Sequence, residues 1–202
     1  MKKDLDHALE TANQILSTAF ELKETARKSK KDFKLFFEAS KKFKEASEAY
    51  KDLVKKTTNE NDKESMQLYS EYYIHESLSC KSAYFYEKGD IAHALTLLEE
   101  ADAKLDLLLT DGGKIASKDP TILKNIKKWE FHKYCNKANF FAYKGRENFR
   151  NGRYIEALDN YQQAIDASKE CVVVAEKKVM ANELEQVYLR ISNGNVCGMY
   201  FN

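Results

Sequence analysis

The sequence predicts an all-α protein built from long antiparallel helices. The 202 residues include one proline, Pro120, and seven glycines, which are too few turn residues for an all-β fold. Over long segments, apolar residues recur three and four positions apart, the spacing of one face of an α-helix. Aromatic residues make up 12% of the chain, so we expect a core of several helices in which rings fill the gaps. The length suits a single domain over residues 1–202.

The first helical hairpin is expected over about residues 4–57. Its first helix, about Asp4 to Lys28, carries a continuous apolar stripe, and the polar segment SKKD at 29–32 is the expected turn. The second helix extends to about Lys56 and places several aromatic side chains on one side. The polar segment TTNEND at 57–62 then ends the hairpin and offers N-cap residues for the next helix.

The second hairpin is expected over about residues 60–110. Its first helix should end near Lys88, because Gly89 and Asp90 provide a C-terminal glycine and an N-cap aspartate in succession. The partner helix should then run from Ile91 to about Thr110. We expect the segment DGGKIASKDP, residues 111–120, to be the one true loop, since Asp-Gly-Gly is strong turn chemistry and a proline suits the first turn of the following helix.

The third hairpin is expected over about residues 119–170, with its turn at Asn151-Gly152. A C-terminal capping helix should follow over about residues 171–192. The apolar stripe changes phase near Ala175, so the sequence is compatible with one unbroken helix over 153–192 or with a bend. The chain then ends in apolar residues that suggest further helix beyond them. Such residues predict another contact, with downstream chain or with a second copy: Met199, Tyr200 and Phe201.

Around the third turn, small and aromatic residues occupy the positions where two antiparallel helices would touch. They are, in order, Gly145, Phe149, Gly152, Tyr154, Ala157, Tyr161 and Ala164. This series closely resembles a tetratricopeptide (TPR) repeat, the helix-turn-helix unit of many adaptor proteins. A fair second match covers about residues 78–102, with Ser82 in the place of Gly145, and a weak third match lies in the first 57 residues. The matching residues Ala39, Ala94 and Ala157 are 55 and 63 residues apart, whereas regular TPR arrays repeat at about 34. The resemblance therefore implies a TPR-like array of three elongated hairpins.

The resemblance also implies a non-enzymatic scaffold that binds a partner protein or peptide. In the family, the first helix of each hairpin lines a concave binding face. In this chain that helix carries the residues we expect to bind the partner: Asn139, Tyr143, Arg146, Phe149 and Arg150. Phe149 has a competing structural role, because its spacing also predicts packing against Tyr161. TPR domains that hold the C-terminal carboxylate of chaperones use Lys, Asn and Arg on these faces. Here the corresponding positions are Ala142 and Arg146 in one hairpin and Ser79 and Ala83 in another, so that activity is not expected.

Two other functions compete with the scaffold prediction. The segment from Lys124 to Arg153 has a net charge of +7 with aromatic residues interleaved, a composition that can hold single-stranded nucleic acid. Helical periodicity explains the same rings as core residues, with the lysines solvating the outside of the helix. Over the whole chain, an acidic middle lies between two mildly basic ends, which is unlike a nucleic-acid-binding protein. The third possibility is a structural oligomerisation module, which would self-associate.

Catalytic and metal-binding patterns are weak. His132 and Cys135 are three residues apart, and Glu71 and His75 four apart, but each pair is only half of a metal site. The sequence contains no nucleophile elbow and no glycine-rich phosphate loop, so we expect neither an enzyme nor a cofactor. No segment approaches 18 apolar residues, which predicts a protein without a membrane span. The four cysteines are far apart and form no C-x-x-C, which predicts reduced thiols in a cytoplasmic protein.

Overall fold

The computed structural model describes residues 2–29, 32–116 and 120–176. All regular secondary structure in these ranges is helical, which confirms the all-α prediction. The chain divides into two compact units, residues 1–126 (the first unit) and 127–202 (the second unit), with the boundary inside one helix. The single-domain organisation expected from the sequence stays a prediction. The helices are α1 (Lys2–Lys28), α2 (Lys34–Lys56), α3 (Glu60–Lys88), α4 (Ile91–Ile115), α5 (Pro120–Arg150) and α6 (Tyr154–Glu176).

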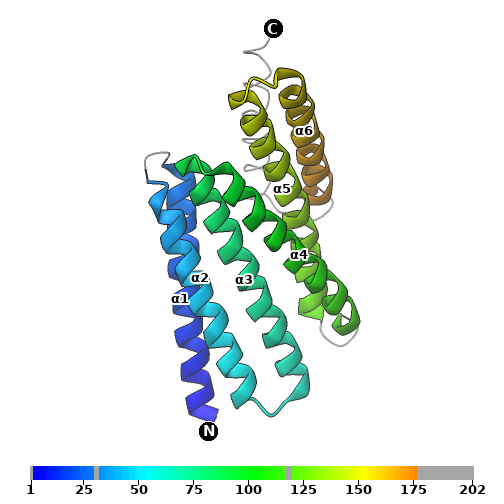
Figure 1. The fold of residues 1–202 in the computed structure, drawn as a ribbon. Coiled ribbons are helices and arrows are strands. Elements are labelled where there is room, and N and C mark those ends of the chain that lie inside the picture. The colour runs from blue at the N-terminus through cyan, green and yellow to red at the C-terminus, as the bar shows by residue number, and fades with distance from the viewer. Residues whose placement is uncertain (1, 30–31, 117–119, 177–202) are drawn as a thin grey trace. The chain divides into compact units, whose positions relative to one another are not determined.

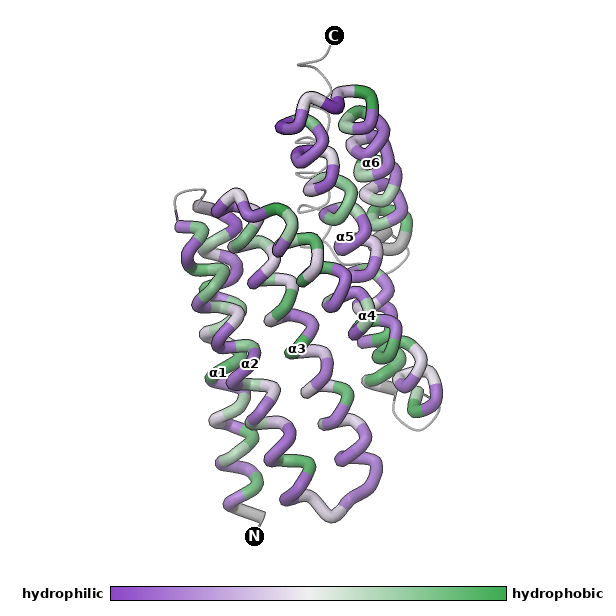
Figure 2. Tube along the Cα trace, in the orientation of Figure 1, coloured by the Kyte–Doolittle hydropathy of each residue, from purple (hydrophilic) through white to green (hydrophobic). Residues whose placement is uncertain are grey.

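In the first unit, each helix packs against the next one along the chain. Helix α1 packs on α2, α2 on α3, and α3 on α4, and the chain direction alternates from one helix to the next (Figure 1). Hydrophobic and hydrophilic residues are interspersed along the helices (Figure 2), and α3, which packs on both α2 and α4, buries polar residues such as Ser70 and Ser77 as well as apolar ones. This arrangement confirms the expected array of helical hairpins.

Alanines and aromatic rings build the contacts between α1, α2 and α3. Ala12 and Ala39 are fully buried, and such small residues let helix backbones approach closely. The ring of Phe43 on α2 is fully buried and meets Phe20 on α1 edge to face, with ring centroids 5.0 Å apart. Burial of such a ring contributes roughly 2–3 kcal/mol. Tyrosines extend this layer of rings, since the ring centroids of Tyr50 on α2 and Tyr73 on α3 are 5.2 Å apart. In α1, α2 and α3, aromatic rings therefore serve helix-to-helix packing.

Local chemistry sets the ends of α3. Asn59 is the N-cap, and its side-chain oxygen accepts hydrogen bonds from the backbone N–H groups of Asn61 (2.9 Å) and Asp62 (3.4 Å). At the other end, Gly89 has a φ of 94°, a left-handed conformation that glycine adopts without strain. Asp90 then caps α4 by accepting a hydrogen bond from the N–H of His93 at 3.2 Å. The expected boundary at Gly89-Asp90 is confirmed.

The prediction of a loop beginning at Asp111 is wrong. Helix α4 continues through both glycines to Ile115, and residues 117–119 lie outside the described residues. The reason is tertiary packing: Leu105, Leu108 and Gly112 follow one another on the buried face of α4. Glycine costs a helix only about 1 kcal/mol relative to alanine, so burial of the preceding leucines can outweigh the turn preference of the pair.

The second unit contains a hairpin made by α5 and α6. Gly152 has a φ of 72° and ends α5, as the sequence predicts, and the N–H of Arg153 donates to the carbonyl of Asn148 at 2.9 Å. Close approach of the helices depends on Gly145, where an added Cβ would lie 2.8 Å from ring atoms of Tyr161. Helix α6 is unbroken to Glu176. The rest of the expected capping helix, with the choice between one helix and two over 153–192, lies outside the described residues.

Candidate partner-binding surface

Four large apolar side chains lie exposed around the turn of the α5–α6 hairpin. Their exposed fractions are 42% for Phe149, 55% for Tyr154, 82% for Ile155 and 44% for Leu158. We call these four residues the hairpin patch. Single exposed apolar residues are common on soluble proteins, but a cluster of four within ten positions is typical of a contact surface.

The hairpin turn brings the patch together. Phe149 is in the last turn of α5, and its ring meets that of Tyr154 edge to face, with centroids 5.6 Å apart. Tyr154 and Ile155 are the first two residues of α6, and Leu158 follows four positions after Tyr154 and three after Ile155. Residues at these spacings are neighbours on a helix surface. The patch therefore forms one continuous apolar area at the turn rather than four isolated side chains.

Arginines flank the patch. Arg146 lies three residues before Phe149 on α5, and Arg150 and Arg153 are exposed at the two sides of the turn. Glu156 is an exposed acidic residue in the same region, so the positive charge is partly offset. Aromatic residues and arginines are the side chains most enriched among the energetically dominant positions of protein interfaces.

The five residues predicted to bind a partner differ in exposure. Phe149 and Arg150 are exposed, Asn139 and Arg146 are half-buried, and Tyr143 is only 8% exposed. The residues at positions 139, 143, 146 and 150 recur at helical spacing and share one side of α5, and Phe149 lies next to that side. Tyr143 is buried, so its ring lies in the interior of the described structure, whereas Phe149 and Arg150, and in part Asn139 and Arg146, reach the surface.

Sequence reasoning missed the α6 half of the patch as a contact surface. On α6, Leu158, Tyr161 and Ile165 recur at helical spacing, a pattern that predicts a face packed on another helix. In the structure Leu158 is 44% exposed, because the hairpin partner covers α6 on another side. One feature of the sequence could have indicated this surface. Ile155 is an apolar residue in the first turn of a helix and lies outside the apolar stripe, so it is not expected to be covered by the hairpin partner.

Most rings of the basic segment of α5 are buried or half-buried. Trp129 and Phe131 are 1% and 2% exposed, and Tyr134 packs against the small core formed by Phe131, Cys135 and Cys171. Stacking on nucleic-acid bases requires exposed ring faces. Among the described rings of this segment Phe149 is exposed, at 42%, so base stacking would depend on a ring of the hairpin patch.

A buried polar cluster joins helices of the first unit. Lys23 of α1 donates a hydrogen bond to Oε2 of Glu76 on α3, and the hydroxyl of Tyr72 donates to Oε1 of Glu76 at 2.6 Å. Lys23 and Glu76 are 7% and 1% exposed. Burying two charges is costly, and such a pair is tolerated only where further hydrogen bonds satisfy it, as Tyr72 does here. The cluster fixes how α1 and α3 align.

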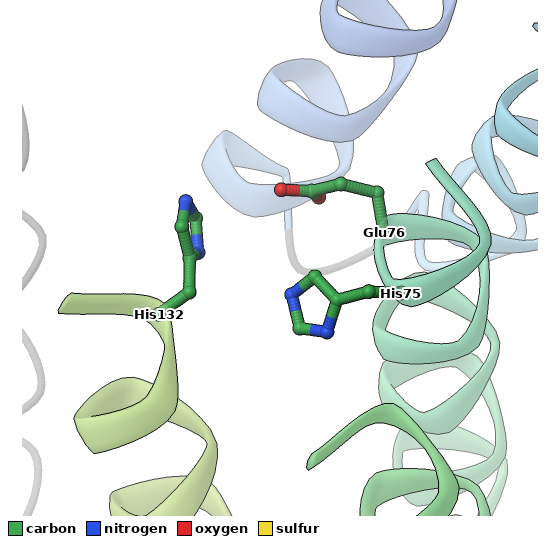
Figure 3. Close-up of side chains that lie close together, drawn as sticks. All are labelled: His75, Glu76 and His132. Atoms are coloured by element: carbon green, nitrogen blue, oxygen red, sulfur yellow. The ribbon is translucent and has the colours of Figure 1, made fainter. Parts of the chain in front are cut away.

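His75 lies next to Glu76 on α3 (Figure 3) and is also fully buried. Its Nδ1 is 3.1 Å from the carbonyl oxygen of Ala101 on α4, so a neutral ring with a proton on Nδ1 donates there. Burial lowers the pKa of His75 below its ordinary value. Glu71, the predicted companion of His75, forms an ion pair with Lys104 at 2.7 Å. Both contacts tie α3 to α4.

Comparison of the chain with family models, curated proteins and solved structures found no match. The TPR resemblance therefore stays a prediction from the sequence. Within the described ranges, no helix combines the length and the apolar character needed to cross a lipid bilayer.

Proposed function

We propose that this chain is a non-enzymatic scaffold that binds a partner protein, with the hairpin patch as the main contact surface. The proposed partner presents a segment with apolar side chains for the patch and acidic side chains for Arg146, Arg150 and Arg153. The observation that supports the proposal most is the exposure of the hairpin patch, whose four apolar residues lie together at one turn.

The energetics favour a protein over a small ligand. Complete burial of an exposed isoleucine, leucine or aromatic side chain contributes roughly 1.5–3 kcal/mol. Ile155 is 82% exposed, so nearly all of its burial energy is available to a partner. Four such side chains form a surface without an enclosing cavity, which suits a helix or an extended segment of another protein. Arrays of helical hairpins commonly bind in this way, because neighbouring repeats bury the core and leave outer surfaces for ligands.

Two alternatives predict different behaviour. A nucleic-acid binder would use the basic segment from Lys124 to Arg153, and its affinity would fall steeply with salt because binding releases counterions. Because Trp129 and Phe131 are buried, that alternative would depend mainly on charge, with Phe149 as the exposed ring of the segment. An oligomerisation module would use the hairpin patch against a second copy of the same chain, which is the competing occupant of this surface.

The first experiment compares proteins captured from the host's lysate by wild type, by Ile155→Ser and by Val173→Ser. Val173 is the matched control, since it is an aliphatic residue on α6, 44% exposed, and about 27 Å from Ile155 at 1.5 Å per residue. The proposal expects a partner that binds wild type and Val173→Ser and is lost with Ile155→Ser. Its affinity is then measured with purified proteins, where Ile155→Ser should weaken binding by about tenfold or more.

A second comparison uses Arg146→Glu/Arg150→Glu, with and without nuclease. The scaffold function is supported if wild type captures the same partner with and without nuclease and the double arginine variant does not capture it. Material that disappears on nuclease treatment would favour the nucleic-acid alternative. Capture of only the chain itself, together with a concentration-dependent mass in sedimentation, would favour the oligomerisation module. Equal capture by wild type and Ile155→Ser would contradict the proposed surface.

A further inference from the structure

Two cysteines meet inside the α5–α6 hairpin. The sulfur of Cys135 on α5 lies 3.5 Å from the sulfur of Cys171 on α6. Both are buried, at 6% and 0% exposure, in the core that also contains Phe131. The two sulfurs are already in van der Waals contact, so a bond between them requires a movement of about 1.5 Å to reach the disulfide length of about 2.05 Å.

We propose that Cys135 and Cys171 form a reversible intramolecular disulfide when the protein is exposed to a hydroperoxide such as hydrogen peroxide. In the first step, the sulfur of one cysteine attacks a peroxide oxygen, forming an S–O bond as the O–O bond breaks. The departing hydroxide takes the thiol proton and leaves as water, and a sulfenic acid remains. The second sulfur then attacks the sulfenic sulfur, which forms the S–S bond and releases a second water. Two electrons pass from the two sulfurs to the peroxide, and a thiol reductant reverses the reaction.

Proximity favours this pair over other outcomes. Reactive groups held in contact have a very high effective concentration, so the second step should be faster than further oxidation of the sulfenic acid or attack by an external thiol. Burial limits access, which favours a molecule as small as hydrogen peroxide over a bulky oxidant. Cys80 belongs to the first unit and takes no part in the described sulfur–sulfur contact, so a sulfenic acid on it would lack the adjacent thiol that the second step needs. Cys197 lies outside the described residues.

The disulfide would lock the two helices of the second unit together. It closes a loop between residues 36 positions apart, which includes the turn and the whole hairpin patch. Closing such a loop reduces the entropy of the unfolded chain. The modification therefore adds stability to the helices that carry the patch. The inference does not depend on the proposed function, because it rests on the two sulfurs alone.

The test treats the purified, reduced full-length protein with hydrogen peroxide, blocks remaining thiols with iodoacetamide and maps tryptic peptides without reduction. The expected product joins the peptide of residues 134–137 to that of residues 170–177, with a mass loss of two hydrogens. Dithiothreitol should separate the two peptides. The oxidised protein should also unfold at a higher temperature, by on the order of 10 °C, and this gain should disappear on reduction.

Two variants keep the test decisive. Cys80→Ala/Cys197→Ala should retain the cross-link, and Cys135→Ala should lose both the cross-link and the rise in unfolding temperature. The wild-type peptide map gives an answer even if a variant fails to fold. Recovery of Cys135 and Cys171 as alkylated thiols or as sulfinic acids after treatment would overturn the proposal, as would a cross-link of either residue to Cys197.

Discussion

The contact between Gly145 and Tyr161 allows a direct test of the α5–α6 packing. Replacing Gly145 by alanine adds a methyl group that would lie 2.8 Å from Cδ1 and from Cε1 of the Tyr161 ring and 3.2 Å from its Cγ. Carbon atoms in ordinary contact are about 3.5–4.0 Å apart, so the ring or a helix must move by several tenths of an ångström.

The expected cost follows from two opposing effects. Alanine stabilises a helix interior by about 1 kcal/mol relative to glycine. Inserting a methyl group into a filled contact costs about 1–3 kcal/mol. The net change for Gly145→Ala is therefore a loss of about 1 kcal/mol in the free energy of unfolding of the second unit. The matched control is Gly113→Ala, because Gly113 is also helical but has nothing within 4 Å of its added Cβ. That variant should gain about 0.5 kcal/mol, since it lies near a helix end.

Fluorescence of Trp129, the only tryptophan, reports unfolding of the second unit in urea, and circular dichroism reports the whole chain. We expect Gly145→Ala to shift the fluorescence transition to lower urea. The same substitution should cost at least 1 kcal/mol less in a Tyr161→Leu background, because the ring that it meets is gone. A stabilising effect of Gly145→Ala, or an equal effect in both backgrounds, would refute the packing described for this hairpin.

Three further predictions concern the buried groups of the first unit. Glu76→Ala should destabilise the first unit by about 3–5 kcal/mol, because Lys23 would keep a buried charge without its carboxylate partner. In urea unfolding, the double variant Lys23→Met/Glu76→Leu should recover most of this loss, because it removes both charges. A double variant as unstable as Glu76→Ala would contradict this reasoning. Folding lowers the pKa of His75, so as the pH falls the imidazole takes up a proton in the unfolded chain before it does so in the folded protein. The free energy of unfolding should therefore fall below about pH 6.5, by at most about 1.4 kcal/mol per pH unit. Urea unfolding at pH 7.5 and 5.5 measures this loss of stability. The loss should be smaller in His75→Gln than in wild type, and unchanged in His93→Gln, because His93 is exposed. An equal loss in all three proteins would exclude His75 as the cause. Iodoacetamide at pH 7.5 should leave Cys80 unmodified until urea unfolds the protein, because burial holds its pKa at about 12; rapid labelling of the native protein would show that Cys80 is accessible.

Helix boundaries could be predicted from the sequence where local chemistry determines them. A glycine that needs a positive φ, as at Gly89 and Gly152, ends a helix in almost any surrounding. An asparagine or aspartate that caps the next helix, as at Asn59, acts within three residues. Such signals require no knowledge of the tertiary structure.

The sequence was less informative where distant residues decide the outcome. The two glycines after Asp111 have turn chemistry, but packing of the neighbouring leucines keeps them in α4. Lys23 and Glu76 are 53 residues apart, and nothing near either residue indicates that they pair. Exposure of Leu158 depends on which side of α6 its partner helix covers, and periodicity defines an apolar stripe without showing how much of it is buried.

The proposed contact surface is tested most directly by photo-crosslinking from its most exposed residue. A benzophenone amino acid is placed at position 155, and in a control protein at Asp52, an exposed position of α2 in the first unit. We predict that irradiation in the host's lysate joins position 155 to one partner protein and that position 52 does not capture it. Excess unlabelled wild type should compete for this partner, whereas excess Tyr154→Ser/Leu158→Ser should not. Equal capture at both positions, or equal competition by the patch variant, would contradict the hairpin patch as the site of partner binding.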